Sequence, residues 1–143
     1  MNSIPYSDAL LQDVLQNTKT IALVGASPKP ERASHEVMHF LLTKGYTVIP
    51  VNPGLAGKEL LGQTVYASLN DIPHPVDMVD VFRNSDAVGP IVNDAIKRGD
   101  KAIWTQLEVI DHHAAERAKA AGLITIMDRC PKIEYPRLNL DKS

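Results

Sequence analysis

The alternation of short apolar segments with amphipathic stretches constrains the fold of this chain more than any other feature of its sequence. The apolar segments lie at 20–25, 46–53, 76–84, 101–106 and 123–130. Their near-continuous apolar character is typical of parallel strands that are covered on both faces. We therefore expect these segments to be five strands of one mainly parallel sheet.

The stretches between the predicted strands have the residue spacing of helices. Those at 34–45, 88–99 and 111–122 each end on a glycine, a common residue just after a helix. A further helix is expected within 6–19, before the first strand, with Ser7 or Asp8 as its cap. Strands that alternate with helices in this way predict an α/β fold, a Rossmann-like three-layer sandwich with right-handed crossovers.

Two segments carry weaker signals. The connection at 54–75 predicts a short helix or an extra short strand at Val65 and Tyr66. The tail at 132–143 predicts a segment that wraps over the surface. A length of 143 residues suits one domain with its own core, so we expect a single domain over residues 1–143.

Composition excludes several classes of function. The formal net charge of -2 gives no general attraction to nucleic acid or to an anionic membrane, so any phosphate binding must be local. The sequence has neither a signal-peptide pattern nor the roughly 18 consecutive apolar residues of a membrane span. The single cysteine, Cys130, excludes an intramolecular disulfide and fits a reducing compartment. We expect a cytoplasmic protein without nucleic-acid or membrane partners.

The loop after the first predicted strand has the features of a phosphate-binding turn. Gly25 can adopt backbone angles that other residues avoid, and Ala26 and Ser27 are small enough for a phosphate to approach the following helix start. A helix dipole contributes only about 0.3–1 kcal/mol to an exposed anion, so charge from Lys29 and Arg32 would help. Glycine and serine also favour ordinary strand-to-helix turns, which is an equally good explanation of this loop alone.

Two features disfavour a nicotinamide cofactor at this loop. An NAD site usually has an acidic residue at the end of the second strand, and an NADP site has a nearby arginine, whereas Asn52 is neutral. Pro28 and Pro30 stiffen the first loop, and the third glycine of the dinucleotide fingerprint is missing. An NAD(P)-dependent oxidoreductase is therefore kept as the alternative function.

The order of several motifs along the chain resembles a known family. The motifs read VGASPKPERASHEVMHFLLTKGYTVIPVNP at 24–53, VDMVDVFRNSDAV at 76–88, AIWTQLEV at 102–109 and MDRCPKIEYPRL at 127–138. Together they resemble the stand-alone CoA-binding proteins related to the CoA-binding domain of succinyl-CoA synthetase alpha subunits. The resemblance implies a Rossmann-like domain that binds CoA or acyl-CoA along the C-terminal edge of its sheet.

The resemblance also implies which residues contact each part of CoA. The pyrophosphate would meet the first loop and the next helix start, the adenine and ribose would lie beyond the second strand, and the pantetheine would lie near the fourth. The residues implied for the pyrophosphate are Gly25, Ala26, Ser27, Arg32 and Ser34. Those implied for the adenine and ribose are Pro50, Val51, Asn52 and Pro53, with Lys58 for the 3'-phosphate. Phe82, Arg83 and Ser85 would contact the middle of CoA, and Trp104 and Gln106 would contact the pantetheine.

The resemblance does not carry catalysis. In the synthetases, the phosphorylated histidine and the nucleotide-binding domain lie outside this module. We therefore expect a non-catalytic CoA or acyl-CoA binder without a metal site, or a regulatory subunit that lends its CoA site to a separate acyl-CoA enzyme. Glu108 stands where relatives often have a glycine, which adds bulk and charge at the predicted thiol end.

The remaining reactive side chains have ordinary structural explanations. Cys130 lies between Arg129 and Lys132 and is a candidate for a mixed disulfide with CoA, although simple packing at a strand end is favoured. The histidines lack the further ligands of a metal site. The acidic residues at 77, 80 and 128 are expected to be strand-end caps or partners of arginines.

Overall fold

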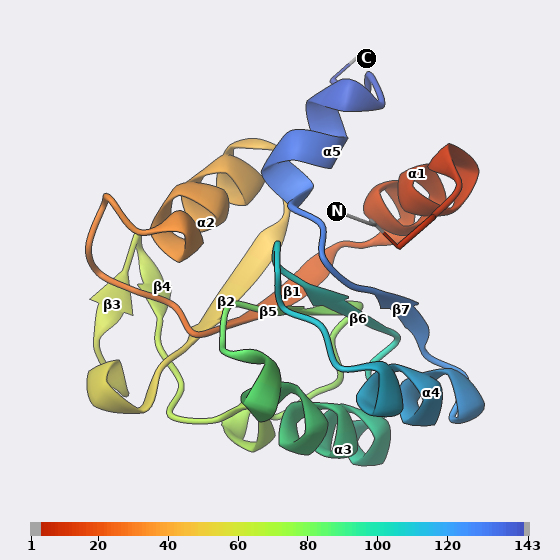
Figure 1. Ribbon diagram of the computed structural model, residues 1–143. Coiled ribbons are helices and arrows are strands. Elements are labelled where there is room, and N and C mark those ends of the chain that lie inside the picture. Colours follow the sequence, from red (N-terminus) through yellow and green to blue (C-terminus); the bar gives the residue numbers. More distant parts are fainter. Residues whose placement is uncertain (1–3, 142–143) are drawn as a thin grey trace.

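The computed structural model describes residues 4–141 and confirms the predicted α/β sandwich. Within these residues, five strands form an all-parallel sheet in the order β2-β1-β5-β6-β7 (Figure 1). The strands are β1 (Thr20–Val24), β2 (Thr47–Val51), β5 (Met78–Val81), β6 (Ala102–Thr105) and β7 (Ile124–Ile126).

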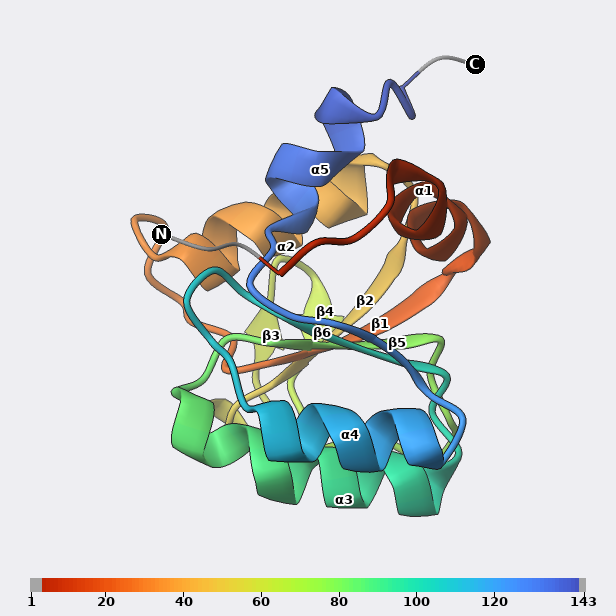
Figure 2. The same cartoon turned by 45° about the vertical axis from the view of Figure 1, so that its right-hand side comes forward.

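Helices cover both faces of the sheet. Figure 2 shows α1 (Asp8–Asn17), α2 (Ala33–Thr43) and α5 (Pro131–Arg137) on one face, and α3 (Val88–Arg98) and α4 (His112–Ala120) on the other. Successive strand residues therefore enter two separate cores. In β1, Leu23 packs into the core beneath α1, α2 and α5, while Ala22 packs into the core above α3 and α4.

The helices α1 to α4 begin and end close to the residues that the sequence predicts. The Ser7 hydroxyl accepts a hydrogen bond from the amide of Leu10 at 3.1 Å and caps α1. Asp111 caps α4 in the same way, through the amide of Ala114 at 3.0 Å. Gly99 follows α3 with a φ of 82°, a left-handed conformation that glycine adopts without strain.

The first weakly predicted segment contains short elements of the expected kinds, although its strand residues precede Val65 and Tyr66. The connection after β2 forms a 3-10 turn, η1 (Pro53–Leu55), an antiparallel hairpin of β3 (Glu59–Leu60) and β4 (Gln63–Thr64), and a second turn, η2 (Leu69–Asp71). The hairpin strand β4 lies beside β2 (Figure 1), but Tyr66 forms only an isolated bridge with Val51. The tail, expected to wrap over the surface, forms the helix α5, which packs against α1 and α2 and was not predicted.

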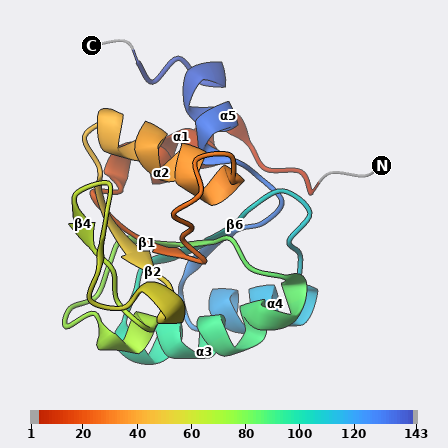
Figure 3. The same ribbon diagram turned by 90° about the vertical axis from the view of Figure 1, so that its left-hand side faces the viewer.

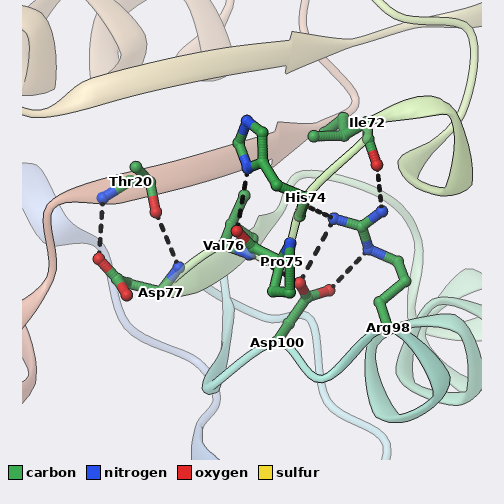
Figure 4. Close-up of polar contacts among 8 residues, drawn as sticks. All are labelled: Thr20, Ile72, His74, Pro75, Val76, Asp77, Arg98 and Asp100. Atoms are coloured by element: carbon green, nitrogen blue, oxygen red, sulfur yellow. Dashed lines mark hydrogen bonds and ion pairs between the residues drawn. The ribbon is translucent and has the colours of Figure 1, made fainter.

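Polar contacts anchor the strands at the end of the sheet opposite their carboxyl ends (Figure 4). Asp77 accepts hydrogen bonds from the amides of Lys19 at 2.9 Å and Thr20 at 3.1 Å, which confirms the predicted strand-end cap. Burial raises the pKa of Asp77, but these amides and Lys101 outweigh it and hold the pKa below its ordinary value. These residues are structural anchors, and the site lies at the other edge.

Candidate functional site

A cavity of about 920 Å³ lies where the strand order reverses. The chain runs from β1 outward to β2 and then returns past β1 to β5, so the loops after β1 and β5 diverge at the carboxyl ends of the strands. Parallel α/β sheets characteristically bind ligands in this crevice. The walls come from the loops after β1, β2 and β5, from the start of α2, from residues 67–69, from Ala87 at the end of η3 (Ser85–Ala87) and from α3.

Gly25 shapes the first wall of the cavity. It has a φ of 97°, one of the backbone angles that other residues avoid, and a Cβ here would collide with the carbonyl of Phe82. The amides of Gly25 and Ala26 both donate to the carbonyl of Val51, at 3.0 and 3.2 Å. These two amides are therefore engaged by β2, and the uncapped start of α2, where Arg32 makes no side-chain cap bond, is the better anion-facing group.

Asn52 holds two walls of the cavity together. Its side-chain Nδ2 donates to the carbonyl of Ala26 at 2.7 Å, and its Oδ1 accepts from the amide of Gly54 at 2.8 Å. The side chain thus joins the loop after β1 to the turn after β2. Both ends of the amide are occupied by these contacts, so Asn52 serves to position the loops.

The charges that line the cavity are mostly positive. Lys29 and Arg32 come from the loop after β1, and Arg83 comes from the loop after β5. None of the three forms an ion pair with any residue that the structure describes. Asp94 of α3 is the acidic residue of the lining. Unpaired cations around a concave surface attract an anionic ligand even though the whole chain is slightly acidic.

Most residues that the family resemblance implies for CoA lie together in this cavity. They are Gly25, Ala26, Ser27, Arg32, Ser34, Val51, Asn52, Pro53, Phe82 and Arg83. The others do not line it. Pro50 is buried within β2, Lys58 is exposed beyond η1, and Ser85 accepts a hydrogen bond from the amide of Ile110 at 3.0 Å.

Neither of the two residues implied for the pantetheine lines the cavity. Trp104 is fully buried in the core, and its indole nitrogen donates to the carbonyl of Arg129 at 3.0 Å. Gln106 is partly buried, and its Oε1 has no hydrogen-bond partner among residues 4–141. Side-chain direction along a strand decides whether such residues face a core or a crevice, and the motif alone does not give that direction.

The wall formed by α3 was missed at the sequence level. Pro90, Ile91 and Asp94 line the cavity from one side of this helix. Their spacing is that of a single helix face. The available signal was that α3 follows β5, whose carboxyl end borders the point where the strand order reverses.

Comparison with known proteins assigns the family. A family model described as "CoA binding domain" matches residues 19–136. The chain belongs to the CoA-binding domain family. This CoA-binding domain is 35% identical over 129 residues to the uncharacterized protein YneT of Bacillus subtilis, covering 90% of the chain and 94% of YneT.

Two further relatives differ in how much of their length the chain covers. A solved structure of a hypothetical protein from Pyrococcus horikoshii OT3 is 40% identical, with a TM-score of 0.89 over 97% of this chain and 99% of that one. The alpha subunit of an ADP-forming acetate–CoA ligase I from Pyrococcus furiosus is 30% identical over 95 residues, which are 64% of this chain but 21% of the subunit. The chain therefore matches about a fifth of that subunit.

The loop after β6 keeps a tight turn in this CoA-binding domain without a glycine. Glu108 has a φ of 69°, and its amide donates to the Asp128 carboxylate at 2.6 Å. Asp128 thus caps the loop after β6, which is close to its predicted role as a strand-end cap. The hydrogen bond holds a glutamate in a conformation that usually favours glycine.

Asp80 departs from its predicted role. It was expected to be a strand-end cap or an arginine partner, but its side chain has no exposed surface and neither carboxyl oxygen bonds to any described residue. Burial raises the pKa of Asp80 well above its ordinary value. The carboxyl group points into the core beneath α2, where strand alternation directs it together with Met78.

Cys130 and the other candidate groups lie in surroundings that give them no special reactivity. Cys130 is buried, and its flanking cations are directed elsewhere, because Arg129 donates to the carbonyl of Asp128 and Lys132 lies 3.9 Å from Glu36. Within the described part of the chain, no group of three or more histidine, cysteine or acidic side chains is placed to hold a metal ion. No helix of residues 4–141 is long and apolar enough to cross a membrane.

Proposed function

We propose that this chain binds CoA or acyl-CoA in the cavity at the carboxyl ends of its strands and does not itself catalyse a reaction. The observation that carries the proposal is the meeting of three unpaired cations with the uncapped start of α2 at this crevice. Membership of the CoA-binding domain family supports CoA over other anionic ligands.

The phosphates of CoA fit the positive wall. Lys29, Arg32 and Arg83 supply charge, and the first turn of α2 supplies backbone donors and the positive end of the helix dipole. Hydrogen bonds to charged groups contribute about 1.5–3 kcal/mol each, and the entropy lost on association offsets part of their sum, so several are needed for micromolar binding.

The contacts of Asn52 favour CoA over a nicotinamide cofactor. In NAD sites an acidic side chain at this position accepts hydrogen bonds from the ribose. Here both ends of the Asn52 amide bond to the backbone of neighbouring loops. We further propose a cytoplasmic location, in keeping with a single cysteine in a reducing compartment.

Isothermal titration calorimetry with CoA, dephospho-CoA, NAD and NADP tests the proposal. We expect CoA to bind more tightly than both nicotinamide cofactors. Lys29→Ala should weaken CoA binding about tenfold, a loss of about 1.4 kcal/mol, because it removes one charge from the phosphate wall. Lys119→Ala, at an exposed lysine of α4 outside the cavity, is the matched control. No measurable CoA binding, or tighter NAD binding, would overturn the proposal.

A further inference from the structure

The cavity is electrically asymmetric, and Asp94 is the residue that makes it so. Lys29 and Arg32 line the wall on the α2 side, whereas Asp94 lines the wall formed by α3. Figure 3 shows these two helices on opposite faces of the sheet. One part of the cavity therefore presents cations, and another part presents a carboxylate.

The Asp94 carboxylate is left without an arginine partner on its own helix, because Arg98 binds other groups. An aspartate and an arginine four residues apart on a helix commonly pair, and Arg98 stands at that spacing. Arg98 instead donates to Asp100 at 3.0 Å and to the carbonyls of Ile72 and His74, each at 2.7 Å (Figure 4). No residue within 4–141 forms an ion pair or a hydrogen bond with the Asp94 carboxylate.

A free carboxylate in a nucleotide cavity selects a hydrogen-bond donor. It accepts hydrogen bonds and repels phosphate, so it is poorly placed for the pyrophosphate or for the ribose that carries the 3'-phosphate of CoA. The lining also includes the apolar Ile91 on the same side of α3 and the apolar Leu69 of η2, the turn that packs against α3. Apolar side chains suit the face of a planar base, and the amine of adenine is a donor on the edge of that base.

We propose that Asp94 determines base specificity by accepting a hydrogen bond from the exocyclic amine of adenine. The inference rests on the proposed function, because it assigns a role to one residue of the same cavity. A base with a carbonyl oxygen in place of the amine would set an acceptor against the carboxylate. That base would lose the hydrogen bond from the exocyclic position, and its ring N1–H would reach the carboxylate only if the base shifted.

The test compares CoA with the analogue in which hypoxanthine replaces adenine, by calorimetry on the full chain. We expect the wild type to bind CoA at least about tenfold more tightly than the analogue. Asp94→Asn should reduce this ratio to about one, because an asparagine amide can also donate to a carbonyl oxygen. Asp86→Asn removes the same charge from an exposed residue outside the cavity, and it should keep the wild-type ratio.

The outcomes separate this inference from the proposed function. CoA binding with no preference over the analogue overturns the role of Asp94 and leaves CoA binding in place. Equal loss of affinity for both ligands in Asp94→Asn, with the ratio unchanged, also overturns it and indicates a contact with the ribose hydroxyls. Failure of the wild type to bind CoA overturns both proposals. The ratio of the two affinities is measured first on the wild type, which needs no variant. A folding defect in Asp94→Asn therefore cannot hide a lack of preference for CoA.

Discussion

Asp80 lies in β5, at the centre of the sheet, and its carboxyl group has no hydrogen-bond partner among the described residues. Burial raises its pKa well above the ordinary value, so the folded chain holds this proton more tightly than the unfolded chain does. The stabilising effect of that proton is complete below the ordinary aspartate pKa of about 3.9. It is lost as the pH rises toward the raised pKa of the folded state.

Asp80→Asn should remove this pH dependence. Relative to the wild type, the variant should gain stability as the pH rises from 4 to 7, by up to about 1.4 kcal/mol per pH unit while Asp80 stays protonated in the folded state. Urea denaturation across this range measures the difference, and Asp86→Asn at an exposed site is the control. Parallel stability curves for Asp80→Asn and the wild type would contradict the raised pKa.

Single residues were predictable from sequence where a local rule decides their role. The positive φ of Gly25 and the capping by Ser7 depend on the residue type and its position next to a helix or strand. The role of Asp80 was not predictable, because burial without a partner depends on which elements cover that face of the sheet. The same holds for Trp104, whose motif gave its strand but not its direction.

The contact between the end of β1 and the end of β5 requires a glycine at Gly25. Gly25 and Gly57 both have positive φ, but a Cβ at Gly25 collides with the carbonyl of Phe82, whereas a Cβ at Gly57 has no atom within 4 Å. Gly57→Ala should therefore cost only the backbone strain, about 1–2 kcal/mol. Gly25→Ala should cost about 1–3 kcal/mol more, because the strand ends must move apart.

Denaturant unfolding of the two variants isolates the effect of this contact, since the strain of a positive φ is common to both. Equal losses of stability would show that the approach of β5 to β1 is not tight. We also expect Gly25→Ala to weaken CoA binding more than Gly57→Ala, because Phe82 and the neighbouring Arg83 line the cavity and would move with the end of β5.

Elements with a full hydrophobic period were predictable, and the shortest ones were not. The strands of the sheet and the helices α1 to α4 each carry several apolar residues in register with their period. β3 and β4 have two residues each, too few to show any period. α5 was missed because Pro136 lies inside it, a residue that normally argues against a helix.

At the scale of the whole molecule, the cavity joins parts of the chain that are far apart in sequence. Loops after β1, β2 and β5 and one face of α3 meet there only when the sheet is formed. A ligand that contacts these walls therefore binds the folded chain and not the unfolded one. By mass action, such a ligand stabilises the fold by about 2.7 kcal/mol at about 100 times its Kd.

For a chain of 143 residues, this stabilisation corresponds to a rise in Tm of roughly 5–10 °C when CoA is added at that concentration. Lys29→Ala should melt like the wild type without ligand, because Lys29 is exposed and forms no ion pair with the described residues, but it should show a smaller rise at the same CoA concentration. Lys119→Ala should show the wild-type rise.

Added salt should reduce the CoA-induced rise in Tm in the wild type more than in Lys29→Ala, because screening acts on a charge that the variant has already lost. An equal effect of salt on both proteins would mean that Lys29 does not contact the phosphates.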